Sequence, residues 1–273
     1  MTPILCFDLE TIPDAAGLRR LESFDSSLAD AEGVAAVQAA RMESHGNDFL
    51  PQYLQRVWVV GCAFRDEEGF RVRCLGDSHG ASDEEESARI RSFFKVIEKH
   101  TPQLVSWNGS GFDLPVLHHR AMIHGVPAPR YWEQGDDDRD FKYNNYLSRY
   151  HHRHCDLMDV VSGYQNRAFA PLDGLARLCG FAGKLGEDGS KVWQSFLEGR
   201  GESVRAYCET DVVNTYLLFS RFRLIRGEWS EKFYQDELQL VRESLEKMVG
   251  DATSPLKGEH WKRYLAEAPA LHR

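Results

Sequence analysis

The sequence predicts an α/β fold in which one central sheet carries helices on both of its faces. Apolar, β-favouring runs alternate with segments whose apolar residues recur at helical spacing. The resulting order of strand, hairpin, helix, strand, helix, strand and helix mixes the two kinds of element. The composition, with 42% hydrophobic, 11% aromatic and 27% charged residues, is typical of a globular protein and excludes a disordered or fibrous chain.

Five apolar runs are predicted to be strands, and the second and third form an antiparallel hairpin. The hairpin is inferred because only the polar stretch at residues 65–69 separates the two runs, which gives a five-residue loop. The predicted strands are residues 4–10, 57–64, 70–75, 104–107 and 154–161.

The clearest helix start lies at Ser82 or Asp83. Either side chain can cap a helix, residues 84–86 are glutamates that suit the positive end of the helix dipole, and apolar residues follow at helical spacing. The other predicted helices are residues 17–27, 28–42, 114–124, 172–178, 203–223 and 231–249.

The segments between these elements suggest how the chain is organised. Residues 14–56 carry helical patterns without strand signals, so we interpret them as an insertion or a cap over the end of the first strand. Residues 125–153 are polar, aromatic and charged, which is typical of a long loop rather than a core element. A glycine-containing loop is expected at residues 180–189, and a tail of uncertain order at the carboxyl end. We expect one domain over residues 1–225, with a helical extension of it at 226–273.

The charge balance bounds the class of partner. The formal net charge is −9, from 33 basic and 42 acidic residues, which argues against a protein that coats nucleic acid through counterion release. It does not exclude an enzyme whose acids hold metal ions, because the charge of the ions then also acts on phosphate.

Hydropathy and cysteine usage bound the compartment. The mean hydropathy is −0.47, no apolar run reaches the length of a membrane span, and the first residues show no secretory pattern. The six cysteines lack paired spacings and are interpreted as reduced core residues. We therefore expect a cytoplasmic protein without a membrane partner.

Two acids share one face of the first predicted strand. Side chains at i and i+2 of a strand point the same way, so Asp8 and Glu10 lie together at its carboxyl end. Burying both in so apolar a run would cost several kcal/mol each unless a cation lay between them. The alternative is a strand end at which the acids meet solvent or an arginine.

A third acid follows the predicted strand at residues 104–107. Asn108 and Gly109 form a turn where backbone can approach a ligand, and Phe112 offers a face on which a base can stack. Asp113 then lies near the start of the next helix, where plain capping is the alternative explanation for an aspartate.

A phenol and a carboxylate are paired on the long predicted helix at residues 203–223. Tyr207 and Asp211 are four residues apart, so they lie on one side of the helix, one turn from each other. The alternative is a tyrosine packed in the core beside an exposed aspartate.

Taken in order, these three motifs resemble the exonuclease motifs of the DEDD superfamily. They are Asp8-x-Glu10, Asn108-Gly-x-x-Phe112-Asp113 and Tyr207-x-x-x-Asp211. The tyrosine indicates the DEDDy branch, because the histidine branch has its histidine where this chain has Ala206. Within that branch the chain looks like the stand-alone exonucleases related to the proofreading domain of B-family DNA polymerases, over about residues 4–222.

The resemblance implies a ribonuclease-H-like mixed sheet and a two-metal site. Asp8, Glu10, Asp113 and Asp211 would hold two Mg²⁺ or Mn²⁺ ions, and Tyr207 would orient the attacking water. Independent chemistry agrees, because hard cations prefer carboxylate oxygen and paired metals stabilise both the attacking and the leaving oxygen. The residues expected to bind the terminal sugar and the last bases are Leu9, Thr11, Asn108 and Phe112.

Other polar runs carry weaker signals. The histidines of residues 151–154 point in different directions, so we interpret this run as a basic, stacking-capable loop or a solvated loop rather than a metal site. Asp156 and Asp159 are expected near the same end of the sheet, at most as supporting residues. Residues 136–138 are three aspartates that lack the pattern of a calcium loop.

We therefore expect a metal-dependent 3′→5′ exonuclease that releases 5′ mononucleotides from single-stranded DNA or RNA with a free 3′ end, with DNA slightly favoured. The alternatives are a catalytically silent nucleic-acid-binding or scaffold module on the same fold, and a structure-specific endonuclease that uses the same metals. A protein partner could bind at the 14–56 insertion or at the helix of residues 231–249, although such a helix more often packs on its own core.

Overall fold

The computed structural model describes residues 2–76, 80–186 and 189–272. Within these residues five strands form one sheet in the order β3-β2-β1-β4-β5. β1 pairs with β2 and β2 with β3 in antiparallel fashion, whereas β1–β4 and β4–β5 are parallel. The predicted mixed sheet is confirmed, and β1 is its central strand. The strands are β1 (Ile4–Pro13), β2 (Gln55–Asp66), β3 (Gly69–Cys74), β4 (Gln103–Ser106) and β5 (His154–Asp156).

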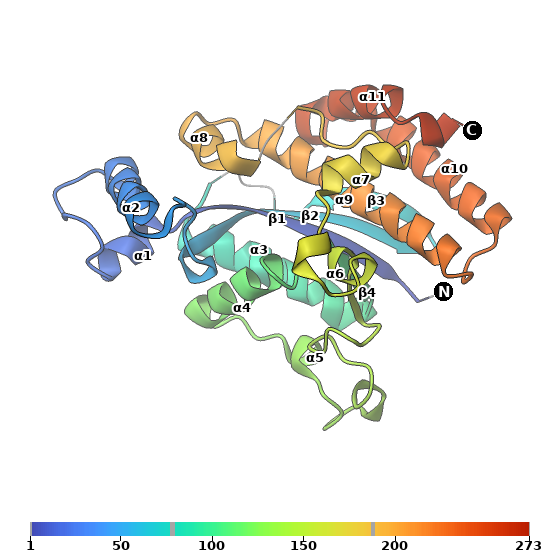
Figure 1. Cartoon of the computed structure of the whole chain (residues 1–273), viewed down its shortest axis with the longest axis horizontal. Coiled ribbons are helices and arrows are strands. Elements are labelled where there is room, and N and C mark those ends of the chain that lie inside the picture. Colours follow the sequence, from blue (N-terminus) through green and yellow to red (C-terminus); the bar gives the residue numbers. More distant parts are fainter. Residues whose placement is uncertain (1, 77–79, 187–188, 273) are drawn as a thin grey trace.

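Helices cover both faces of this sheet, as predicted (Figure 1). α3 (Asp83–His100) and α4 (Asp113–His124) lie on one face, and α9 (Gly201–Ile225) and α10 (Glu231–Met248) on the other. Among the helices of the described residues, none combines the length and apolar character that a membrane crossing needs. The other helices are α1 (Ala15–Arg20), α2 (Asp30–His45), α5 (Pro129–Trp132), α6 (Leu157–Val161), α7 (Leu172–Leu178), α8 (Val192–Leu197) and α11 (Glu259–Ala266). Short 3₁₀ helices lie at Gln52–Leu54, Arg139–Phe141, Asn166–Ala168, Gly189–Lys191, Pro255–Gly258 and Pro269–His272.

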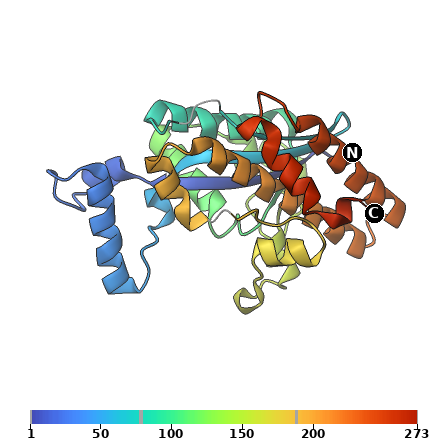
Figure 2. The same cartoon turned by 90° about the horizontal axis from the view of Figure 1, so that it is seen from above.

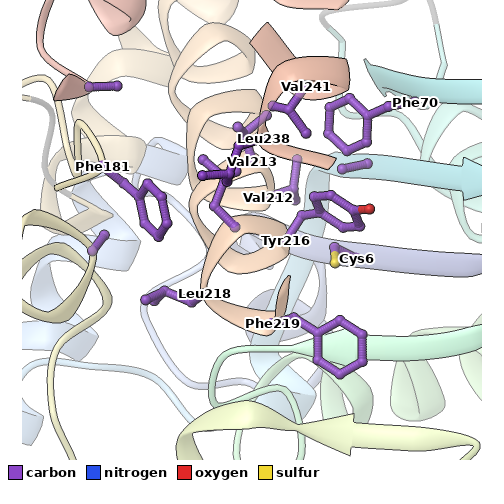
Figure 3. Close-up of a cluster of buried hydrophobic side chains, with 14 of the residues drawn as sticks. Cys6, Phe70, Phe181, Val212, Val213, Tyr216, Leu218, Phe219, Leu238 and Val241 are labelled. Carbon is purple, nitrogen blue, oxygen red and sulfur yellow. The ribbon is translucent and has the colours of Figure 1, made fainter. Parts of the chain in front are cut away.

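Alternation along β1 divides the core between the two faces. Cys6 packs in a cluster with Val212 and Tyr216 of α9 (Figure 3). Leu5 and Phe7 belong to a second cluster, which includes apolar residues of α3 and α4. Because side chains of a strand alternate between its faces, the two acids that follow Cys6 at even spacing continue the row that faces α9.

Two predicted strand boundaries are wrong. The hairpin loop has two residues rather than five, because pairing between β2 and β3 continues through Asp66 and Gly69. The last strand ends at Asp156 rather than at residue 161. There the Asp156 carboxylate accepts a hydrogen bond from the backbone N–H of Asp159 at 3.5 Å and starts α6.

Two segments contribute more to the core than the sequence predicts. In the long loop at residues 125–153, Tyr131 and Tyr146 are buried, and their rings stack with centroids 5.6 Å apart. The carboxyl-terminal tail forms α11, whose Trp261 and Tyr264 are fully buried. These aromatic residues are buried by contacts with other elements of the fold.

The predicted insertion projects from the end of the sheet at which β1 finishes (Figures 1 and 2). We call residues 14–54 the arm. Its first helix is shorter than predicted, because α1 ends at Arg20. The arm has a small core of its own, formed by Leu18, Val34, Leu50 and Leu54.

A buried network of charges fixes the base of the arm. Arg120 of α4 is inaccessible to solvent and pairs with Asp14, where the arm begins, and with Glu86 of α3. Arg56 of β2 lies 3.3 Å from Oδ1 of Asp14. Buried charges are tolerated when they are paired and hydrogen-bonded, so this network joins the arm to both β2 and the α3–α4 layer.

Replacing Arg120 with methionine would remove the most deeply buried cation that pairs with Asp14 and Glu86, and would leave them the longer contacts with Arg56 at 3.3 and 3.6 Å. We expect the free energy of unfolding to fall by about 3–5 kcal/mol, measured by urea denaturation at neutral pH. The matched control is Arg263→Met, which removes an exposed pair with Glu267 on α11 and should cost less than about 1 kcal/mol. Equal losses in the two variants would contradict this account.

Candidate active site

The two acids of β1 lie beside α9. Glu10 is buried and Asp8 is half-buried, and ligand atoms of Asp8, Glu10 and Cys208 all lie within 4.8 Å of one another. The pairing of β1 with β2 shifts register directly after Glu10. Bulges of this kind redirect side chains next to active sites. The end of β1 therefore presents both acids to one small volume.

Tyr207 and Asp211 reach the same volume from α9, and both are buried. The space between the elements is a cavity of about 340 Å³. Most of the residues that the sequence singles out line it, and these are Asp8, Leu9, Glu10, Thr11, Phe112, Tyr207 and Asp211. A strand end and one helix face thus meet at a single cavity.

Asp113 and Asn108 have other surroundings. Asp113 is buried at the start of α4, and its Oδ1 accepts a hydrogen bond from the backbone N–H of Leu9 at 2.9 Å. The capping position itself is held by Phe112. Asn108 lines a separate cavity of about 450 Å³. The fold therefore ties Asp113 to the acidic strand but places Asn108 outside the cavity of the other acids.

Asp156 positions the turn between β4 and α4. Its carboxylate accepts hydrogen bonds from the backbone N–H groups of Asn108 at 2.9 Å and Ser110 at 2.8 Å. Asn108 has a φ of 67°, in the left-handed region that asparagine tolerates. A Cβ on Gly109 would lie 2.3 Å from Oγ of Ser106, so only glycine fits there. Asp156 is thus a supporting residue of this turn.

Burial and mutual repulsion oppose ionisation of the carboxyl groups. Burial, followed by the charges of neighbouring carboxylates, raises the pKa of Asp8 and of Glu10 well above their ordinary values. Burial raises the pKa of Asp113 to about 7 and that of Asp211 to about 6. The cluster can carry its full negative charge at neutral pH only beside a compensating cation.

The donor set fits divalent metal ions. Within the described part of the chain, Oδ1 of Asp211 is buried and has no hydrogen-bond partner. Leaving a buried carboxylate oxygen unsatisfied is costly, and coordination to a metal would satisfy it. Carboxylate oxygens are the ligands that Mg²⁺ and Mn²⁺ prefer. The acids of β1, α4 and α9 could therefore hold such ions.

Lys184 is a cavity residue that the sequence does not predict. Its ammonium donates a hydrogen bond to the phenol oxygen of Tyr207 and lies 3.5 Å from Oδ2 of Asp211. Burial opposes its charge, but Asp211, Asp8 and Glu10 outweigh burial and raise the pKa of Lys184 above its ordinary value. The only local signal is a cation in a glycine-containing loop, which is too common to mark a site.

The carboxyl-terminal helix supports the loop that carries Lys184. Asn214, on α9 beyond Asp211, accepts a hydrogen bond from the backbone N–H of Gly183 at 3.3 Å and donates one to its carbonyl at 3.0 Å. Tyr264 of α11 donates to Oδ1 of Asn214 at 2.7 Å. A chain of hydrogen bonds therefore runs from α11 to the cavity.

The histidines of residues 151–154 have structural partners. The backbone N–H of Asn145 donates to Nδ1 of His151 at 3.0 Å. His154 is buried and shares a hydrogen bond with Ser106 at 2.8 Å, and burial lowers the pKa of His154 to about 4. These contacts join the long loop to β4.

A known protein family matches most of the chain. Its description is "Predicted 3'-5' exonuclease related to the exonuclease domain of PolB", and the match covers residues 47–268. The chain belongs to this family. Asp113, Tyr207 and Asp211 lie within the matched residues 47–268. Asp8 and Glu10 precede them. The expected relationship to the polymerase exonuclease domain is confirmed.

Two similar proteins are DNA polymerases. The DNA polymerase of Archaeoglobus fulgidus is 25% identical over 132 residues, which are 47% of this chain and 16% of the polymerase. The family B DNA polymerase of Pyrobaculum calidifontis superimposes with a TM-score of 0.50 and 16% identity, over 94% of this chain and 27% of that one. The present chain thus matches less than a third of the length of each polymerase. The structural likeness supports the shared α/β fold and is consistent with the ribonuclease-H-like class.

Asp113→Asn should stabilise the metal-free chain at neutral pH. Because the pKa of Asp113 is raised from 3.8 to about 7, the folded chain keeps a proton that the unfolded chain releases, so stability falls as pH rises through this range. Asparagine stays neutral and can still accept the bond from Leu9. In EDTA we expect the variant to exceed wild type by about 1–3 kcal/mol in free energy of unfolding near pH 8, and the gap to close near pH 4. Urea denaturation across this range measures the gap, and a gap independent of pH would contradict the prediction.

Asn214→Ala would remove both hydrogen bonds to Gly183 and release the Lys184 loop. We expect a fall of about 1–3 kcal/mol in the free energy of unfolding, because buried backbone groups lose their partners. Ser220→Ala is the control, since it removes one bond between that buried side chain and the carbonyl of Tyr216 within α9. Thermal unfolding of both variants checks the difference, and a smaller loss for Asn214→Ala than for the control would refute it.

Proposed function

We propose that this chain is a metal-dependent 3′→5′ exonuclease. It would hydrolyse phosphodiester bonds of single-stranded nucleic acid from a free 3′ end, with DNA slightly favoured over RNA, and release 5′ mononucleotides. The observation that carries the proposal is the meeting of buried carboxylates from β1 and α9 with Tyr207 and Lys184 at one cavity. Family membership supports the reaction class. We place the reaction in the cytoplasm, because the six cysteines are free thiols, as in a reducing compartment.

Asp8, Glu10, Asp113 and Asp211 would hold two Mg²⁺ or Mn²⁺ ions. When bound, such ions activate a water and stabilise the attacking and leaving oxygens of an in-line displacement. The protein would contribute by holding the carboxylate oxygens in position before the ions bind. The register shift after Glu10 and the hydrogen bond from Leu9 to Asp113 do this at β1 and α4.

Tyr207 would orient the attacking water as a hydrogen-bond donor. Burial, followed by the charge of Asp211, raises the pKa of Tyr207 far above its ordinary value, so the side chain remains a phenol. Lys184 donates a hydrogen bond to the phenol oxygen, and the phenol is itself hydrogen-bonded to Asp211, so both contacts hold the Tyr207 hydroxyl beside the acids. The charge of Lys184 would also attract the phosphate of the strand.

The remaining cavity residues would hold the end of the strand. Leu9 and Thr11 flank the acids of β1 and would contact the terminal sugar, and Phe112 would contact the last bases. Asn108 lines the neighbouring cavity, so its place would be further from the 3′ end. The turn between β4 and α4 would thus separate the terminal nucleotide from those before it.

The test is digestion of single-stranded DNA carrying a 5′ label, in Mg²⁺, Mn²⁺ or EDTA. Wild type should yield a ladder that shortens from the 3′ end in metal only. Asp8→Asn and Asp211→Asn should each lose about 10³-fold in rate, because each removes several kcal/mol of transition-state stabilisation.

The control variant is Asp236→Asn, an exposed acid of α10 that pairs with Lys232, and its rate should equal wild type. A 3′-phosphate on the strand should block digestion, whereas an endonuclease would ignore it. Comparing the digestion rate of RNA of the same sequence with that of the DNA would show which sugar is preferred. Undiminished digestion by Asp8→Asn would overturn the proposal.

A further inference from the structure

The arm forms part of the wall of the cavity that holds the acids. Gln38 of α2 lines this cavity, as do Asp48, Phe49 and Leu50 from the segment after α2. The proposed reaction uses none of these side chains. Although the arm projects from the sheet (Figure 2), its inner segment belongs to the site.

The lining of the cavity falls into two chemical classes, like a nucleotide. Among the charged or polar residues that suit metal and phosphate are Asp8, Glu10, Lys184, Tyr207 and Asp211. Among the apolar or aromatic residues that suit a base are Phe49, Leu50, Phe112 and Trp193. The volume of about 340 Å³ is near the lower end for small-molecule pockets, which suits one terminal nucleotide.

Phe49 is the arm residue suited to a base. Phe49 is 56% exposed although it lines the cavity, so much of the residue is open to contact with a ligand. Its ring centroid lies 5.5 Å from that of Phe112, at an interplanar angle of 53°. The two rings form an aromatic surface shared by the arm and the α4 turn. Aromatic faces of this kind stack with bases irrespective of sequence.

The segment around Phe49 is held in place by its neighbours. Leu50 is buried, and its carbonyl accepts a hydrogen bond from Nε2 of Gln55 at 2.9 Å. Nε2 of Gln52 donates to the carbonyl of Gly111 at 3.2 Å, which joins the arm to the turn beside α4. A surface fixed in this way loses little conformational entropy when a ligand binds.

We propose that the arm is the base-binding wall of the site and that Phe49 stacks on the base of the 3′-terminal nucleotide. This inference rests on the proposed function and assigns a specificity-determining role to the insertion. The stacked base would set the terminal phosphodiester against the acids of β1 and α9. The arm would thus select for a terminal nucleotide that carries an unpaired base.

The experiment compares two single strands of DNA, one with an intact 3′-terminal nucleotide and one whose 3′-terminal nucleotide is abasic. Wild type should favour the intact end about tenfold in kcat/KM. Phe49→Ala should reduce this preference to about onefold, through a higher KM for the intact strand alone. Phe49→Trp should restore the preference, since it restores a stacking face.

Tyr53→Ala is the matched control, because Tyr53 is an exposed aromatic of the same arm that packs against His119 with centroids 6.4 Å apart. It should keep the wild-type preference. Full preference in Phe49→Ala, or equal losses on the two strands, would overturn the inference while leaving the exonuclease intact. Digestion of neither strand by wild type would remove the proposed function, and this inference with it.

Discussion

The convergence of like charges on the buried end of β1 is the constraint on which the rest of the structure depends. Burial of a carboxylate without a cation is costly, and here acids arrive from β1, α4 and α9. They cannot withdraw to solvent, because Leu5, Cys6 and Phe7 anchor the strand between two apolar layers at 1% exposure or less. The free energy of packing therefore holds the acids where electrostatics alone would separate them, and bound cations would recover part of that cost.

Two clusters of buried carboxylates differ in how far nearby cations compensate their charge. At the base of the arm, burial tends to raise the pKa of Asp14, but Arg120 and other partners outweigh it and the pKa is lowered. In the cavity, Lys184 offsets the acids only in part, and the pKa of Asp8 stays raised. The first cluster is complete in the folded chain and serves to hold the arm. The charge of the second cluster is only partly compensated, which is typical of candidate functional sites.

Features with a local cause are predictable from the sequence, and features with a tertiary cause are not. The spacing of Asp8 and Glu10 follows from strand alternation, and the start of α3 follows from the capping box of Ser82 and Glu85. The early end of β5 does not, because Asp156 also bonds to the turn after β4, which only the fold brings near. The place of Lys184 in the cavity is likewise not predictable, because its partners lie on β1 and α9, which only the fold brings near. The order of α11 depends likewise on buried aromatic contacts, which only the fold supplies.

Under the proposed function, contacts that depend on charge and contacts that do not would both contribute to binding of the strand. With a net charge of −9 and an acidic cavity, the metal-free chain repels a polyanion, and Lys184 offsets only part of this locally. Metal binding and strand binding would therefore be coupled, and by linkage each would strengthen the other. Contacts to phosphate weaken with salt, whereas stacking on Phe49 involves no charge. As salt rises, stacking on Phe49 and Phe112 would thus carry a growing share of the affinity, because the other arm residues at the cavity include an acid, Asp48, that cannot attract phosphate.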